Sequence, residues 1–493
     1  MKKLKSISTS RWALFVYGLA SCLAFAPYFL FPVLWFSFAI LAAKNNQAGH
    51  KASFINAFCF GAGLGITGMN WLAYAMLLGD GNYAWLIPFI WVGFGLFFGL
   101  YYGLSAWLAS FSKPGHTRWF AFAGWFCIVE WIRGWAFSGF PWNVIGNIWN
   151  AYLPILQVVS VMGVYGLGLL TILLFTTPHF GQKLKPTLYA LLALILVYGF
   201  GSWRLYDAPK DAVWGVTLRV VQPNVPCTLK WDPREAQNNI NKLIKLSKKD
   251  NDNITHVVWP ESAVSFSINT NERARLQLMA AVRQGAVLIT GAMRVVNKKD
   301  RSAANSLVVL NDLTDITAVY DKAHLVPFGE YTPLRGILPL DKFVPFDSDI
   351  VAGPGPKTIR VEKAPNAGPL VCYEAIFSGE AVEKKHRPQW MINVTNDGWY
   401  GRSAGPHHHF AMAQTRAVEE GLPLVRSANT GISGVIDPYG RIWNSLGLEE
   451  EGVIDSPLPK AILPTPFSQY GNTIPLLLAV AFVLISFFKQ KST

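Results

Sequence analysis

Eight apolar runs, each near the length that spans a lipid bilayer, constrain this sequence more than any other feature. They cover residues 11–27, 28–43, 53–76, 84–110, 118–136, 160–178, 187–203 and 472–488. A helix needs about 20 apolar residues to cross the hydrocarbon core, so these runs predict a multi-span α-helical membrane domain. The second run is short, and we expect the first two to form a tight hairpin around Ala26 and Pro27.

The composition agrees with a membrane protein. Of the 493 residues, 51% are hydrophobic and only 15% are charged, which is too apolar for an average soluble protein. Between the seventh and eighth runs lies a long stretch of ordinary soluble composition. We therefore predict a transmembrane arm of about seven helices (residues 1–203), an extramembrane domain (204–470), and a C-terminal transmembrane helix with its tail (471–493).

Lysine and arginine are distributed unevenly among the predicted loops. They lie before the first span, in alternate loops, and after the last span, at Lys2, Lys3, Lys5, Arg11, Lys44, Lys51, Lys113, Arg118, Lys183, Lys185, Lys489 and Lys491. If the spans alternate, all of these residues lie on one side. Positively charged loops stay cytoplasmic, so we expect both termini in the cytoplasm and residues 204–470 on the outer side.

The formal net charge of +13 raises the question of nucleic-acid binding. The basic residues form short clusters beside apolar runs and no long basic patch, which is the distribution of a membrane protein. We therefore predict no nucleic-acid partner. An alternative at the N-terminus is a cleaved signal peptide, since Ala24, Phe25 and Ala26 resemble a cleavage site; cleavage would not change the orientation of the rest.

The segment from 204 to 470 has the pattern of an α/β domain. Strand-like runs recur as VTLRVVQPNV, THVVWPESAV, AVLITGAMRV, NSLVVLND, ITAVYDKAHLV, GPLVCYEAIF, PQWMINVTND and GVIDPYGRIW. Helix-like segments cover 235–249, 271–284 and 410–420. Strands that alternate with helices predict a buried sheet.

Three polar residues follow or end apolar strands in this domain: Glu261, Lys322 and Cys372. Residues at the ends of neighbouring strands converge on one pocket in open α/β sheets. A carboxylate can take the proton of a thiol, and an ammonium favours the thiolate and stabilises the oxyanion formed on an acyl carbonyl. The set predicts acyl transfer through a cysteine thioester.

The contexts of these residues, "WPES", "YDKAHLVPFGEY" and "LVCYEAIF", resemble the Glu-Lys-Cys triad of the nitrilase superfamily. With the membrane spans and "EWIRGWAFSGFPWNVIG", nearly the whole chain resembles the membrane-embedded N-acyltransferases of that superfamily. The resemblance implies an α-β-β-α sandwich outside the membrane. It also implies that Cys372 is the acylated nucleophile, Glu261 the general base and Lys322 the stabiliser of the tetrahedral intermediate.

Four further positions match the family. Glu330 matches a second acidic residue near the lysine, Tyr373 and Glu374 match the residues after the nucleophile, and Trp231 matches an aromatic residue on a mobile loop at the substrate entrance. Each position also has a structural alternative: a solvated loop carboxylate for Glu330, packing for Tyr373, bonds to backbone donors for Glu374, and an ordinary surface or interface tryptophan for Trp231.

The resemblance also implies the substrates and the location. The acyl donor is expected to be a phospholipid, typically phosphatidylethanolamine, and the acceptor the N-terminal amine of the diacylglyceryl-cysteine of an apolipoprotein. A ping-pong reaction is expected in the bacterial inner membrane, with the catalytic domain periplasmic and the enzyme monomeric. The family needs no cofactor or metal.

Several alternatives remain open. The enzyme could be a membrane-tethered amidase that uses water as acceptor, or the chain could be a transporter with an outer sensing domain. Cys227 and Cys372 could pair as a disulfide in an oxidising compartment. The tract His407–His409 could bind metal, but adjacent histidines lack separated ligand geometry, and we expect a polar loop. Glu130 and Arg133, near the outer end of the fifth span, are interpreted as a structural pair.

Overall fold

The computed structural model describes residues 10–78, 83–177, 184–248, 253–297, 302–333 and 350–488. The chain forms two compact units, which are described separately. The helical unit comprises residues 1–208, 403–419 and 464–493, and the sheet unit comprises 209–402 and 420–463. The predicted domain limits at 203 and 470 stay predictions. Of the basic residues used for orientation, Lys2, Lys3, Lys5, Lys183, Lys489 and Lys491 lie outside the described residues.

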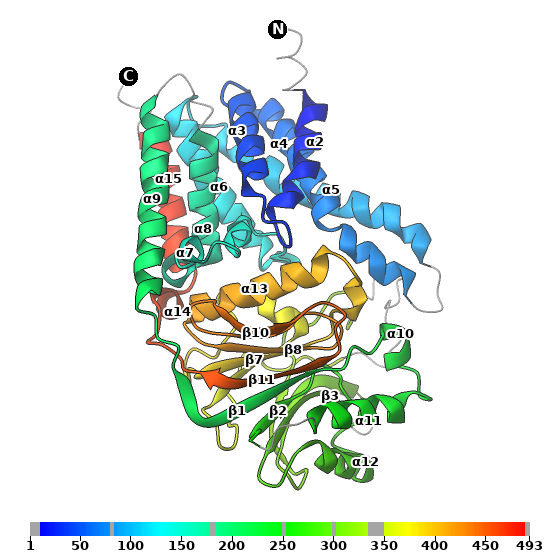
Figure 1. The fold of residues 1–493 in the computed structure, drawn as a ribbon. Coiled ribbons are helices and arrows are strands. Elements are labelled where there is room, and N and C mark those ends of the chain that lie inside the picture. The colour runs from blue at the N-terminus through cyan, green and yellow to red at the C-terminus, as the bar shows by residue number, and fades with distance from the viewer. Residues whose placement is uncertain are drawn as a thin grey trace. The chain divides into compact units, whose positions relative to one another are not determined.

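Helices of the helical unit coincide with all eight predicted apolar runs (Figure 1). They are α2 (Arg11–Ser21) with η1 (Cys22–Ala24), α3 (Phe31–Asn45), α4 (His50–Gly68) with η2 (Asn70–Leu77), α5 (Ile87–Ala109), α6 (His116–Arg133), α8 (Val159–Thr176), α9 (Leu184–Tyr206) and α15 (Thr473–Phe488). The unit also contains η3 (Ala84–Leu86), η4 (Ala136–Ser138), η5 (Ile145–Trp149), α7 (Leu153–Leu156), α13 (Ala404–Glu420) and α14 (Pro466–Tyr470). The last residue of α13, Glu420, is counted with the sheet unit.

Within the described residues, three helical stretches are long and apolar enough to cross a membrane: 84–109, 159–176 and 188–206. Helices α4 and η2, bent by 40° at their junction, would together make a fourth. The apolar helices at 11–24, 31–45 and 473–487 are shorter. The predicted membrane helices are therefore present as helices, and the number that cross the bilayer stays a prediction.

Small residues allow α2 and α4 to pack closely. A Cβ atom on Gly18 would lie 2.0 Å from the backbone oxygen of Phe60, and one on Gly63 would lie 2.2 Å from that of Phe15. Close packing of this kind is the main source of helix association where lipid removes the hydrophobic driving force.

The sheet unit contains two β-sheets. The six-stranded sheet has the order β11-β1-β2-β3-β4-β5, and the five-stranded sheet has the order β10-β9-β8-β7-β6. The strands are β1 (Ala212–Gln222), β2 (His256–Val258), β3 (Val287–Asn297), β4 (Ser302–Leu310), β5 (Ile316–Asp321), β6 (Ala367–Val371), β7 (Trp390–Thr395), β8 (Leu424–Ala428), β9 (Ser433–Ile436), β10 (Ile442–Leu446) and β11 (Gly452–Pro459). Strands β1, β2 and β3 are parallel, as are β6, β7 and β8.

One apolar core joins the two sheets face to face. It combines Val220 and Ile289 of the six-stranded sheet with Ile392 and Val425 of the five-stranded sheet, all fully buried. The opposite face of the six-stranded sheet is covered by α11 (Ala236–Ser247) and η7 (Gln277–Ala281) in a second core, and α12 (Glu272–Leu276) directly precedes η7. The predicted nitrilase-like α/β sandwich is confirmed.

The strand predictions were incomplete. Strands β8 and β11 were missed, and one predicted run, GVIDPYGRIW, covers both β9 and β10. Arg426 interrupts the apolar pattern of β8, and two prolines in β11 are atypical of a strand interior. The helix expected at 410–420 is longer, since α13 begins at Ala404.

Candidate active site

Cys372 lies where β6 ends and the short helix η8 (Cys372–Ile376) begins. Its φ angle is +52°, in the left-handed region that residues other than glycine rarely adopt. Such a conformation persists only where the surroundings hold it, and it is concentrated at functional sites. The buried thiol shares a hydrogen bond with Thr395, at the end of β7.

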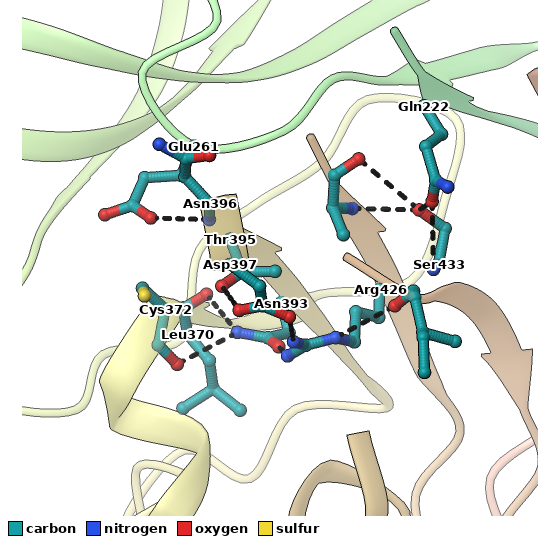
Figure 2. Close-up of polar contacts among 12 residues, drawn as sticks. Gln222, Glu261, Leu370, Cys372, Asn393, Thr395, Asn396, Asp397, Arg426 and Ser433 are labelled. Carbon is teal, nitrogen blue, oxygen red and sulfur yellow. Dashed lines mark hydrogen bonds and ion pairs between the residues drawn. The ribbon is translucent and has the colours of Figure 1, made fainter. Parts of the chain in front are cut away.

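Glu261 follows β2 and is held on both carboxylate oxygens. The side-chain amide of Asn305 donates to Oε1 over 2.7 Å. The backbone N–H of Asn396 donates to Oε2 over 2.8 Å, as Figure 2 shows. Its backbone crosses β3 at Gly291, where a Cβ atom would lie 2.5 Å from the Cα of Glu261. A side chain at 291 would therefore displace the carboxylate.

Lys322 follows β5 and forms a buried ion pair with Glu330, with 2.7 Å between Nζ and Oε2. Asn305 Nδ2 also donates to Glu330 Oε1 over 3.1 Å. The backbone N–H of Val326 donates to Oε2 over 2.8 Å. Glu330 is therefore buried and paired, and the interpretation as a solvated loop carboxylate is wrong.

The three predicted triad residues act on one another electrostatically. Burial raises the pKa of the Cys372 thiol, and the negative charge of Glu261 raises it further, while Lys322 opposes both. Burial alone would lower the pKa of Lys322, but Glu330, with Cys372 and Glu261, raises it above its ordinary value. The raised pKa of Cys372 favours the protonated thiol, and the raised pKa of Lys322 favours the ammonium.

Glu374 joins the nucleophile turn to the segment that carries Lys322. Its Oε2 accepts from the N–H of Val371 over 2.7 Å, directly before Cys372. Its Oε1 accepts from the hydroxyl of Tyr320 and the N–H of Ala323, each over 2.7 Å. The side chain therefore fixes the Cys372 turn relative to the backbone on either side of Lys322.

Tyr373 packs among aromatic rings. Its ring lies edge-on to Phe377 and to His324, with centroids 5.1 Å and 5.7 Å away. Burial raises the pKa of its hydroxyl. These contacts agree with the structural interpretation of Tyr373 from the residues alone.

A buried ion pair supports the loop after β7. Arg426 of β8 contacts Asp397 over 2.6 Å with both side chains fully buried, and it also donates to the side chain of Asn393 (Figure 2). Asn393 Nδ2 in turn donates to the backbone oxygen of Leu370 over 3.1 Å. The pair thus connects β8, β7 and the strand that ends at Cys372.

Trp231 is half-buried and directly follows α10 (Cys227–Lys230). The ammonium of Lys230 lies 6.0 Å from the centre of its ring and donates to the backbone oxygen of Glu261 over 2.7 Å. The loop that carries Trp231 therefore reaches the predicted base. Cys227 and Cys372 are both free thiols, so the structure contains no disulfide between them.

The tract His407–His409 lies in α13 of the helical unit and not in a polar loop, so that expectation is wrong. His408 is buried, and its Nδ1 accepts a hydrogen bond of 3.1 Å from Trp142 Nε1. No group of three or more His, Cys, Asp or Glu side chains within the described ranges could hold a metal ion. The tract is a packing element.

Glu130 and Arg133 pair at 3.6 Å at the end of α6. Arg133 Nη1 also donates to the backbone oxygens of Phe140 and Trp142, each over 2.7 Å, and Glu130 Oε1 accepts from the N–H of Ile145 over 3.1 Å. The pair holds the segment that follows α6, in agreement with the structural interpretation.

Sequence reasoning missed Asn305, Asn396 and Lys230. Asn396 follows the apolar strand β7, so the criterion that found Glu261 would also have found it. Asn305 lies within β4, where one polar residue has no distinctive signal. Lys230 looks like a surface lysine in "CTLKW", and only the structure reveals its burial.

Comparison with known proteins gives matches along both units. The family model "Apolipoprotein N-acyltransferase N-terminal domain" matches residues 17–176, and the model "Carbon-nitrogen hydrolase" matches residues 217–462. The apolipoprotein N-acyltransferase of Rhodopseudomonas palustris is 35% identical over 96% of this chain and 94% of its own. The protein of the same name from Bradyrhizobium diazoefficiens is 36% identical over 95% of this chain and 93% of its own.

Among solved structures, an amidase from Nesterenkonia sp. aligns with 50% of this chain and 92% of its own, at 18% identity and a TM-score of 0.38. That likeness is too distant to carry a functional argument.

Proposed function

Because this chain belongs to the apolipoprotein N-acyltransferase family, we propose that it acylates lipoproteins through a thioester on Cys372. The donor is a phospholipid, with phosphatidylethanolamine as the expected species. The acceptor is the N-terminal amine of a diacylglyceryl-cysteine. The monomeric enzyme works in the inner membrane of a bacterium, with the sheet unit on the periplasmic side.

In the first half-reaction, Glu261 takes the proton of the Cys372 thiol as sulfur attacks the ester carbonyl of the donor. The raised pKa of Cys372 supports this role, because a protonated thiol needs a general base at the moment of attack. Lys322 stabilises the oxyanion of the tetrahedral intermediate. The carbon–oxygen bond then breaks, and Glu261 returns the proton to the leaving oxygen, which releases the lysophospholipid.

In the second half-reaction, the acceptor amine attacks the thioester carbonyl. Glu261 takes the amine proton and passes it to the departing sulfur, which restores the thiol. The amide product and the free enzyme complete a ping-pong cycle.

One observation carries this proposal: the continuous hydrogen-bonded chain from Glu261 through Asn305 to Glu330 and on to Lys322. It fixes a base and a cation, and both act on the pKa of the same thiol. The arrangement suits acyl chemistry and has no role in a transporter. Whether water or an amine resolves the thioester separates the amidase alternative from N-acyl transfer.

The test uses full-length protein in detergent with phosphatidylethanolamine labelled in its acyl chain. Wild type and Cys227→Ala, a matched control for loss of a thiol, are expected to gain label that neutral hydroxylamine releases; Cys372→Ala is expected to gain none. A diacylglyceryl-cysteine peptide should then take the label as an amide. Equal labelling of wild type and Cys372→Ala would overturn the thioester, and release only as free fatty acid would favour the amidase.

A further inference from the structure

The feature that the proposed cycle leaves unused is the buried ammonium of Lys230. It is 7% exposed, and its hydrogen bond to the backbone oxygen of Glu261, 2.7 Å long, is the only one found for it among the described residues. Burial of an ammonium is costly unless charge or hydrogen bonds offset it. An ordinary surface lysine avoids that cost, so this placement calls for a role at Glu261.

The ionisable groups that face Lys230 come from three elements. They are Glu261 after β2, Cys227 on α10 itself, and Cys372 at the start of η8. From α11, the neutral Asn239 lines the same pocket as Lys230. Every facing ionisable group becomes negative on losing its proton, so the positive charge of Lys230 favours each of those anions.

Lys230 differs in its pairing from Lys322, the other buried lysine of the described residues. Lys322 has a carboxylate partner in Glu330 and keeps its proton because its pKa is raised. Lys230 has no direct carboxylate contact among the described residues. Burial therefore dominates and lowers its pKa to about 8, against the opposing effects of Glu261, Cys227 and Cys372.

We propose that Lys230 is a positioning residue for the acylation step, which holds the Glu261 backbone and supplies a titratable positive charge that favours the Glu261 carboxylate and the Cys372 thiolate. This inference rests on the proposed function, since it needs Glu261 to act as the base of Cys372. Lys230 neither gains nor loses a bond in the cycle. It acts by keeping the base in place and by supplying a positive charge beside it.

The sign of the pH effect follows from the charge. Below a pH of about 8 Lys230 is protonated and supports acylation, and above it the ammonium becomes a neutral amine and the support is lost. The rate of thioester formation should therefore fall on the alkaline side with a midpoint near pH 8. Lys322 remains charged over the same range and cannot produce this fall.

Three substitutions of Lys230 separate its hydrogen bond to the Glu261 backbone from the effect of its positive charge. Lys230→Gln keeps a donor for the Glu261 oxygen without the charge, Lys230→Arg keeps both, and Lys230→Met keeps neither. Lys245→Met, which removes an exposed lysine of α11, is the matched control. The measurement is the single-turnover rate of thioester formation on full-length enzyme with labelled phosphatidylethanolamine from pH 6 to 10, with the melting temperature of each variant.

We expect Lys230→Met to acylate about tenfold or more slowly at pH 7, from loss of a charged hydrogen bond. Lys230→Met and Lys230→Gln should both lose the fall in rate at alkaline pH. Lys230→Arg should move the midpoint of that fall upward by a pH unit or more, and Lys245→Met should leave the midpoint unchanged. A purely structural role would lower the rate and the melting temperature without moving the midpoint, and that result overturns the proposal. So does an unchanged rate and profile in Lys230→Met.

The experiment also distinguishes failure of this inference from failure of the proposed function on which it rests. A thioester in wild type that is absent in Cys372→Ala, with normal behaviour of Lys230→Met, rejects only the role of Lys230. Absence of any thioester in wild type rejects the proposed function, and the role of Lys230 with it.

Discussion

Asn305 donates one side-chain N–H to Glu261 over 2.7 Å, and the same nitrogen reaches Glu330 over 3.1 Å. Two carboxylates this close to a common group repel each other when both are ionised. The neutral amide separates them and offers each a hydrogen bond. Glu261 can thus remain free to accept a proton while Glu330 stays paired with Lys322.

Replacement of this amide is expected to impair catalysis in a graded way. Asn305→Ala removes the hydrogen bond to Glu261 and should lower kcat/KM for acyl transfer about tenfold. Asn305→Asp is nearly isosteric but adds a third negative charge, so its loss should be at least about tenfold greater. Steady-state assays check this order.

Asn241→Asp, on an exposed position of α11, controls for the added charge and should behave as wild type. An Asn305→Asp enzyme as active as Asn305→Ala would show that the repulsion argument is wrong.

Glu330→Gln should uncouple Lys322 from its charge partner. Removal of one member of a buried ion pair costs about 3–5 kcal/mol, because the remaining charge is left uncompensated. Loss of Glu330 removes the largest effect that opposes burial, so the pKa of Lys322 should fall relative to wild type. The variant should therefore melt at a lower temperature and lose most acyl transfer, with a larger loss as pH rises.

Glu451→Gln is the comparison for this variant, since Glu451 pairs with Lys242 on the surface over 2.7 Å. Surface pairs contribute about 0–1 kcal/mol. Equal melting temperatures for the two variants would contradict a structural role for the buried pair.

The resting thiol of Cys372 should react slowly with alkylating agents at neutral pH. Burial and the charge of Glu261 raise its pKa, so the thiolate fraction is small and grows as pH rises. Lys322→Met removes the cation that opposes this shift, and a further rise of one pKa unit lowers the thiolate fraction about tenfold.

Iodoacetamide modification, followed by mass spectrometry of the Cys372 peptide, measures this reactivity, and Lys245→Met again serves as control. Fast modification of Cys372 at neutral pH would mean that the thiolate already exists in the resting enzyme. The general-base role of Glu261 would then be unnecessary.

Much of this architecture could be predicted because its signals are local. The apolar runs have the length of helices, and all eight are helices in the structure. Glu261 and Cys372 follow β2 and β6, where parallel pairing of β1–β3 and of β6–β8 brings like ends to one edge. Lys322 follows β5, which the antiparallel pairs β3–β4 and β4–β5 orient in the same direction as β3. Burial of Glu330 depends in part on Asn305, which lies 25 residues away in the sequence, so the local pattern around Glu330 could not reveal it.

The missed strands have the same kind of cause. Strand β8 contains Arg426, whose charge is fully buried only because Asp397 pairs with it from another segment. Sequence patterns treat an arginine as exposed, since unpaired charges are not buried. The ion pair with Asp397 therefore allows Arg426 to be buried in a strand, although the local sequence pattern predicts an exposed arginine.

That buried pair gives the last prediction. Arg426→Met leaves Asp397 as an uncompensated buried carboxylate and should lower the free energy of unfolding by about 3–5 kcal/mol. The double variant Arg426→Met with Asp397→Asn removes both charges and should recover part of the loss, because the remaining amide still has the Thr395 hydroxyl nearby, 3.0 Å from Asp397 Oδ1. Thermal unfolding of the purified protein measures both. Arg234→Met, which breaks an exposed pair with Asp232, should change the melting temperature far less than Arg426→Met does. If Arg426→Met is as stable as Arg234→Met, the pair does not support the sheet, and the Cys372 turn is held by other contacts, such as those of Glu374 and Asn393.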